Sequence, residues 1–196
     1  MHGYGYGCSW STHAALLLLL AVSPLAAAQP WPRCDSSSGN YSAGSAYETN
    51  LLNLVLTLRL NASTSLSRFA SGARGAAPDT VYGLVLCRGD VTDSECLDCG
   101  TAAWERAGTA CRRPVRDVAL CYNACYVRMS DTDFLASTDN SGAIPLISGF
   151  NITSSDVAGY DRALTAILNA TVRYAADSSP ELFATGEWVG SDPGFS

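Results

Sequence analysis

Three cysteines stand close together in the stretch CRGDVTDSECLDC, at Cys87, Cys96 and Cys99. Sulfur atoms at this C-x8-C-x2-C spacing could hold a zinc ion, form a redox pair or join into disulfide bonds. Disulfides persist where the medium is oxidising and are rare in the cytosol. The choice among these chemistries therefore depends on whether the chain is exported.

The N-terminus has the pattern of a secretory signal peptide. The segment THAALLLLLAVSPLAAAQP is apolar from Ala14 to Val22, turns at Pro24 and ends in small residues, where Ala26–Ala28 fits an A-x-A cleavage rule. The apolar run is too short to span a bilayer. We expect residues 1–28 to be a signal peptide and the mature chain to be secreted and extracellular, with no membrane span in this chain.

Export favours a disulfide framework over the other two chemistries. Seven cysteines follow the expected cleavage site, an odd number that leaves one thiol unpaired within the chain. A zinc ribbon needs a second ligand pair at short spacing, often with His, and both histidines, His2 and His13, lie in the expected signal peptide. No βαβ pattern surrounds Cys96 and Cys99, which argues against a thioredoxin-type redox pair. We expect no metal and no other cofactor.

The composition argues against an enzyme and against a nucleic-acid-binding protein. Without His, the mature chain cannot build a Ser-His-Asp or Cys-His catalytic group, and it contains no phosphate-binding glycine loop. The chain has no Lys, and its 12 Arg against 18 acidic residues give a net charge of −6, which opposes nonspecific binding to nucleic acid. We interpret the arginines of CRRPVR (111–116) as a solvated turn, with contact to an anionic or sugar ligand as the alternative.

Glycosylation signals agree with export. The chain contains four N-x-[ST] sequons, and in a secreted protein some of them are expected to carry glycans on the surface. The sequons begin at Asn40, Asn61, Asn151 and Asn169.

The first half of the chain predicts a helix, a connection and a strand. Residues 46–63 carry apolar side chains at helical spacing and predict an amphipathic helix on a sheet. Residues 69–80 are rich in Gly and Pro and predict a connection, whereas residues 80–87 are rich in β-branched and aromatic residues and predict a strand. The helix face is expected to consist of Tyr47, Leu51, Leu52, Val55 and Leu58.

A second helix and a final strand should follow. Thr92 and Glu95 have the spacing of a capping box, and the helix that they start would place Cys96, Cys99, Ala103 and Ala107 on one face. Residues 118–129 predict one strand. Cys121 and Cys125 would then lie on the same side of that strand, about 13 Å apart and too far to bond to each other.

An internal repeat marks the C-terminal part. The motif Phe-Ala-[Ser/Thr]-Gly begins at Phe69 and again at Phe183, 114 residues later, and an amphipathic helix precedes each copy. The second copy stops where the first enters its cysteine-bearing strand, which predicts one and a half domains. The face of the second helix is expected to consist of Tyr160, Leu164, Ile167, Leu168, Thr171 and Tyr174.

The stretch VYGLVLCRGDVTDSECLDC, followed by Cys111 and CYVRMSDTDF, resembles the plant ginkbilobin-type domain, also called domain of unknown function 26 or the stress-antifungal domain. That domain occurs in cysteine-rich repeat secretory proteins and in the ectodomains of cysteine-rich receptor-like kinases. The resemblance implies an α+β fold, an antiparallel, roughly five-stranded sheet with two helices packed on one face, stapled by disulfides. The resulting division is residues 29–135 as the first domain, 136–144 as a linker and 145–196 as an incomplete second copy holding its N-terminal half.

The resemblance also implies the disulfide pairs. Carried over position by position, they are Cys34–Cys111, Cys87–Cys96 and Cys99–Cys125, and Cys121, which has no counterpart in the family, is the unpaired thiol. We expect this thiol either to be buried beside the sheet or to be joined to another chain, which would give a dimer.

None of the three residues of a sugar site in the family is matched here. The resemblance implies a mannose site like that of ginkbilobin. Its residues are an Asn directly after the first cysteine, an Arg about six residues before the last cysteine and a Glu five residues after the last cysteine. Those places hold Asp35, Ala119 (or Val118) and Ser130, so the charged Arg/Glu pair is absent. Asp35 and Ser130 remain as candidate ligand-binding residues.

Together these features predict a secreted, non-enzymatic plant module of the apoplast that binds an extracellular protein or glycan in stress or defence signalling. The alternatives are a mannose-type antifungal lectin-like protein and the truncated ectodomain of a cysteine-rich receptor-like kinase.

Overall fold

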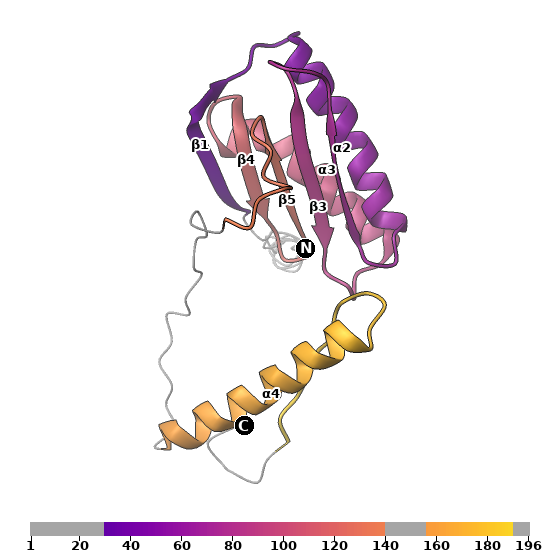
Figure 1. Ribbon diagram of the computed structural model, residues 1–196, viewed down its shortest axis with the longest axis vertical. Helices are drawn as coiled ribbons and strands as arrows, with labels where there is room; N and C mark the ends of the chain where they lie inside the picture. Colours follow the sequence, from indigo (N-terminus) through magenta and orange to yellow (C-terminus); the bar gives the residue numbers. More distant parts are fainter. Residues whose placement is uncertain (1–29, 140–155, 190–196) are drawn as a thin grey trace, which may run out of the picture.

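Five antiparallel strands and two helices make up residues 31–130 of the computed structural model, which describes residues 30–139 and 156–189. The strands lie side by side in the order β1-β4-β5-β3-β2, and α2 and α3 cover one face of this sheet (Figure 1). The expected signal peptide and Asn151 lie outside the described residues. The elements are β1 (Trp31–Asn40), α2 (Ala46–Thr64), β2 (Phe69–Arg74), β3 (Val81–Cys87), α3 (Asp93–Ala110), β4 (Val115–Cys121), β5 (Cys125–Ser130) and α4 (Val157–Asp177).

Helix α2 is held by a polar cap and an apolar face. The hydroxyl of its N-cap Ser45 accepts a hydrogen bond from the Glu48 backbone, and the Glu48 carboxylate accepts one from Gly44 in return. The expected face needs one correction, because Leu52 is 40% exposed and Leu54 is buried. Leu54 follows Leu51 by three residues and so stays on the same side, whereas Leu52 is turned about 100° away. The buried residues are Tyr47, Leu51, Leu54, Val55, Leu58, Ala62 and Ser63.

Strand β3 meets α2 through alternating side chains. Val81 and Val85 are buried in the core, and Gly83 between them lies directly beneath the helix, where an added Cβ would come within 3.0 Å of Leu58 and 3.2 Å of Leu54. Glycine at this position therefore lets the helix approach the sheet closely.

Two sequence predictions about strands were wrong, and one strand was not predicted. Residues Phe69–Arg74, expected to be a connection, form strand β2 along β3, and Trp31–Asn40, for which no element was predicted, pairs with β4 as strand β1. Residues 118–129 form a hairpin of β4 and β5 in place of one strand, and the backbone N–H of Tyr122 donates to the Cys125 carbonyl at the turn. As a result, Cys121 and Cys125 lie on opposite faces of the sheet.

Helix α3 begins as the sequence predicts. Thr92 accepts a hydrogen bond from the Glu95 backbone, and the Glu95 carboxylate accepts one from the Thr92 backbone, which completes the capping box. Cys96 and Ala103 are fully buried against the sheet.

Helix α4 lies apart from the sheet (Figure 1). Asp156 caps its start by accepting from the Gly159 backbone. None of its residues is buried, and Leu164 and Leu168 on the expected apolar face are 40% and 53% exposed.

Candidate ligand-binding surface

Three disulfides hold the framework on which the candidate surface is built. Cys34 on β1 is bonded to Cys111 at the end of α3, Cys87 on β3 to Cys96 on α3, and Cys99 on α3 to Cys125 on β5. These are the pairs that the family resemblance implies. All three bridges reach α3 or the residue that ends it, and they join this helix to β1, β3 and β5.

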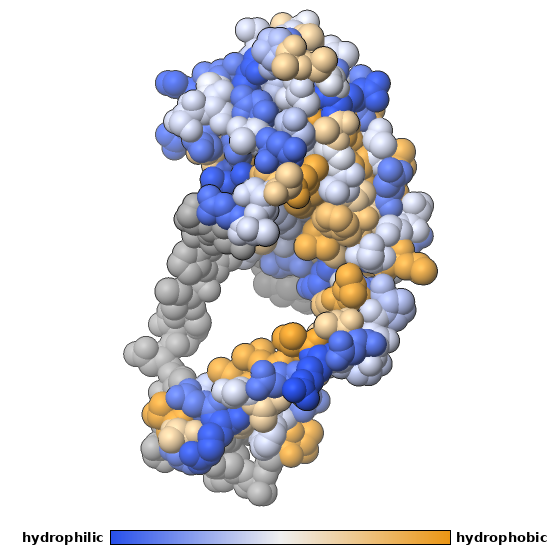
Figure 2. Space-filling view, in the orientation of Figure 1, coloured by the Kyte–Doolittle hydropathy of each residue, from blue (hydrophilic) through white to orange (hydrophobic). Residues whose placement is uncertain are grey.

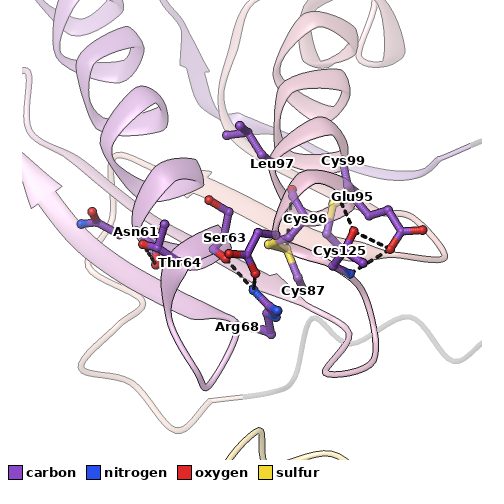
Figure 3. Close-up of a disulfide and its surroundings, with 12 residues drawn as sticks. Asn61, Ser63, Thr64, Arg68, Cys87, Glu95, Cys96, Leu97, Cys99 and Cys125 are labelled. Carbon is purple, nitrogen blue, oxygen red and sulfur yellow. Dashed lines mark hydrogen bonds and ion pairs between the residues drawn. A yellow bond between two sulfur atoms is a disulfide. The ribbon is translucent and has the colours of Figure 1, made fainter.

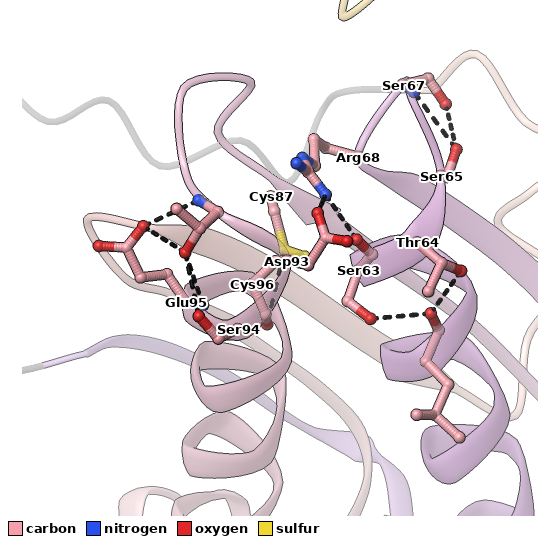
Figure 4. Close-up of polar contacts among 12 residues, drawn as sticks. Ser63, Thr64, Ser65, Ser67, Arg68, Cys87, Asp93, Ser94, Glu95 and Cys96 are labelled. Carbon is pink, nitrogen blue, oxygen red and sulfur yellow. Dashed lines mark hydrogen bonds and ion pairs between the residues drawn. A yellow bond between two sulfur atoms is a disulfide. The ribbon is translucent and has the colours of Figure 1, made fainter.

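A polar bridge joins α2 to the disulfide-bonded part. Arg68 follows α2 in a left-handed conformation, with φ of 53°, and its guanidinium donates to the Ser63 carbonyl and to the Asp93 carboxylate. Figure 3 shows this guanidinium beside the Cys87–Cys96 bond. Figure 4 shows the Glu95 cap at the start of α3. The end of α2 is thereby tied to the start of α3 without a covalent bond.

The sheet face turned away from the two helices, here called the outer face, carries three rows of side chains. Strand register places residues of neighbouring strands opposite one another, and opposed residues point to the same side. The polar row is Asp35, Asp117, Ser130, Tyr82 and Ala73; the arginine row is Arg33, Ala119, Arg128, Leu84 and Ser71; the apolar row is Trp31, Cys121, Tyr126, Leu86 and Phe69.

The Asp117 carboxylate contacts three other side chains of the outer face. It accepts a hydrogen bond from the Ser130 hydroxyl at 3.0 Å and lies 3.4 Å from Arg128 and 4.0 Å from Arg33. The residue is 5% exposed, and its Oδ1 accepts no hydrogen bond within the described part of the chain. A buried carboxylate oxygen beside two guanidinium groups can accept a hydrogen bond from a hydroxyl group or a water molecule.

The two candidate ligand-binding residues differ in access. Asp35 is half-buried at the rim of the polar row and accepts hydrogen bonds from the backbone and hydroxyl of Ser37, which lower the pKa of its carboxyl. Ser130 is fully buried, with no exposed area, and its hydroxyl accepts from the Thr132 backbone while it donates to Asp117. Only Asp35 of the pair can meet a ligand in this conformation.

The segment after β5 covers part of the outer face. The Arg128 guanidinium stacks over the Phe134 ring at 4.1 Å, and in Figure 1 the chain beyond β5 crosses in front of the sheet. Because Arg128 lies opposite Ala119, a guanidinium group stands next to the position where the family site has its arginine. The sequence alone does not show that an arginine of β5 lies beside this position of β4, because strand register becomes visible only in the folded sheet.

The apolar row ends in a cavity of about 500 Å³. Phe69, Leu86 and Tyr126 line it together with the Cys121 thiol, and residues 181–183 close one side. Burial raises the pKa of the Tyr126 hydroxyl above its ordinary value. Cys121 is half-buried and unpaired, and the sheet separates it from the Cys99–Cys125 bond.

The arginines of residues 111–116 divide between solvent and structure. Arg112 and Arg113 are exposed, in keeping with a solvated turn. Arg116 packs over the Tyr47 ring at 4.4 Å and forms ion pairs with Asp79 and Asp131, which makes it part of the framework.

The described sequons lie outside the three rows of the outer face. Asn40 is exposed at the end of β1, Asn61 is exposed in the last turns of α2, and Asn169 is exposed on α4. Glycans at these positions would leave the arginine and apolar rows accessible.

Residues 30–139 and 156–189 contain no cluster of His, Cys, Asp and Glu that is arranged to hold a metal ion. No helix in these two stretches is both long and apolar enough to cross a bilayer.

Three disulfides and a five-stranded α+β fold define a small cysteine-rich domain. The family model described as salt stress response/antifungal matches residues 33–132. The chain belongs to this family.

The relatives include receptor-like kinases and secretory proteins. The chain is 39% identical to cysteine-rich receptor-like protein kinase 6 of Oryza sativa subsp. japonica over 91% of this chain and 27% of the kinase. It is 34% identical to cysteine-rich repeat secretory protein 9 of Arabidopsis thaliana over 60% of this chain and 35% of that protein. The chain thus spans about a third or less of the length of these relatives.

Solved structures show the same fold. The tandem DUF26 ectodomain of the Arabidopsis thaliana receptor-like protein PDLP5 matches with a TM-score of 0.60 at 21% identity, over 72% of this chain and 67% of that one. The PDLP8 ectodomain matches with a TM-score of 0.61 at 20% identity, over 72% and 66%. The five-stranded antiparallel sheet with helices and three disulfides is therefore the DUF26 ectodomain fold.

Proposed function

We propose that the chain is a secreted, non-enzymatic binding module of the apoplast that recognises an extracellular protein through its outer face during stress or defence signalling. The observation that carries the proposal is the outer face itself. Its arginine row and its apolar row lie side by side, and the described sequons are placed elsewhere. Aromatic residues and arginine are the side chains most enriched in protein interfaces.

The proposal is tested by capture of proteins from apoplastic fluid with the glycosylated, disulfide-intact chain. Trp31 is 49% exposed on the apolar row, and Leu60 is 50% exposed on α2, outside that face. Trp31→Ala combined with Arg33→Ala is expected to abolish capture of a partner that the wild type retains. Leu60→Ser serves as the matched control and should keep that partner. Equal loss in both variants, or in neither, contradicts the proposal.

Carbohydrate binding is the second candidate. It is supported by the half-buried Asp35 carboxylate, which feels the charge of Arg33, since carboxylate and guanidinium groups together can bind vicinal hydroxyls. A glycan array probed with the wild type and with Asp35→Asn separates the two functions. A sugar signal that the variant loses favours the lectin function.

The proposal extends to residues 145–196 as the N-terminal half of a second copy. Support comes from the turns that follow α2 and α4. Arg68 has φ of 53° and Leu182, 114 positions later, has φ of 52°. The Arg68 backbone donates to the Ser65 carbonyl and the Leu182 backbone to the Ser179 carbonyl, both at 3.1 Å.

A further inference from the structure

The turn after α4, residues 179–183, contacts the loop between β3 and α3. Phe183 lies against Gly89, which belongs to the loop between β3 and α3. A Cβ atom added at Gly89 would overlap the Phe183 side chain and come within 3.3 Å of Glu181. In Figure 1 this turn is the part of the C-terminal segment that reaches the end of the sheet.

The cavity beside this contact contains both repeated phenylalanines. Phe69 and Phe183 line the same cavity, and each directly follows a residue with φ near 50°, a conformation that is uncommon outside glycine. The first domain supplies apolar walls through Phe69, Leu86 and Tyr126. The cavity is therefore built from both parts of the chain.

Helix α4 takes no comparable part in the contact. Its apolar face is largely exposed, and Figure 2 shows hydrophobic side chains along the side of the helix that borders the gap below the sheet. Cysteine is absent from residues 126–196, so no disulfide can anchor this segment.

We infer that Gly89 and the apolar end of the sheet form an intramolecular docking site for Phe183, and that this contact fixes the C-terminal segment on the first domain. Glycine is required at position 89 because any side chain there would occupy the space of Phe183. When the turn undocks, the apolar row and the Cys121 thiol become more accessible.

Two variants test the docking site from opposite sides. Gly89→Ala fills the space next to Phe183, and Phe183→Ala removes the docked ring without changing the first domain. Gly108→Ala is the matched control, because nothing lies within 4 Å of the added methyl group on α3. Hydrogen exchange of residues 179–183 and the alkylation rate of Cys121 are measured on the full glycosylated chain.

Both test variants should accelerate exchange in residues 179–183 by about tenfold, as expected for the loss of one half-buried aromatic side chain, and Cys121 should react faster. The double variant should be no faster than either single one, since both remove the same contact. If Gly89→Ala also accelerates exchange across Val81–Leu86, it has disturbed the first domain, and Phe183→Ala alone decides. Exchange and alkylation equal to those of Gly108→Ala in the Phe183→Ala variant would overturn the docking site.

Discussion

The absence of a Cβ atom at Gly83 allows α2 to approach the sheet closely. At Gly83, an added Cβ would meet Leu54, Leu58 and the sulfur of Met129. We expect Gly83→Ala to lower the free energy of unfolding by about 1–3 kcal/mol, because an overpacked core must shift. Gly108→Ala, on the exposed side of α3, should instead be neutral or raise it by up to about 1 kcal/mol. Chemical denaturation with the disulfides intact measures both, and equal stability of the two variants would contradict the packing described.

Cys121 is a second case in which one residue determines behaviour. Its thiol lines the cavity on the outer face, and the sheet keeps it away from the Cys99–Cys125 bond on the helix side. We therefore expect its thiolate to attack external disulfides, releasing one of their two thiols, before it exchanges with the internal bridges. Any disulfide-linked dimer seen on a non-reducing gel should disappear in Cys121→Ser. A dimer that persists in this variant would show that another cysteine forms the link.

At the scale of elements, the cap of α3 should make stability depend on pH. Hydrogen bonds from the Thr92 backbone and hydroxyl lower the pKa of the Glu95 carboxyl below its ordinary value. A lowered folded-state pKa stabilises the fold above the unfolded pKa, and this contribution is lost as the pH falls through the folded value. The wild type should thus lose more stability than Glu95→Gln between pH about 5 and about 3. Parallel pH profiles of the unfolding midpoint would exclude a role for this cap.

The elements that the sequence predicts well are those with local signals. Helical spacing from Tyr47 to Leu58 and the Thr92–Glu95 capping box are visible without tertiary context, and both helices form where expected. Strands β1 and β2 lack such signals. WPRCDSSSGN shows no alternation of apolar residues and FASGAR is rich in small residues, so each is a strand only because β4 or β3 lies beside it.

The candidate site shows the same limit more clearly. The sequence identifies Asp35 and Ser130 through the family resemblance, yet it cannot show that Ser130 is buried or that Asp117 lies between them. Arg128 comes to lie opposite Ala119 only because β4 and β5 form a hairpin. The three rows of the outer face depend on strand register across four pairings, which a single sequence does not reveal.

At the scale of the whole molecule, the two repeated helices stand in opposite environments. A shift of 113 positions carries the α2 residues Tyr47, Leu51, Leu54, Val55, Leu58 and Ala62 onto Tyr160, Leu164, Ile167, Leu168, Thr171 and Ala175. The α2 set is 0–4% exposed beneath the sheet. The α4 set is partly exposed throughout, although its side chains are of nearly the same kinds.

This difference predicts unequal protection of the two helices. Burial of each large apolar side chain would favour the folded state by about 1.5–3 kcal/mol, and α4 gains only part of it, while an isolated helix of this length is marginal in water. We expect amides from Leu164 to Tyr174 to exchange much faster than those of Val81–Leu86, with α4 only partly formed in solution. Hydrogen exchange on the glycosylated chain measures both segments at once. Equally slow exchange in the two would mean that α4 has a stable packing partner, because an uncovered helix has no source of such protection.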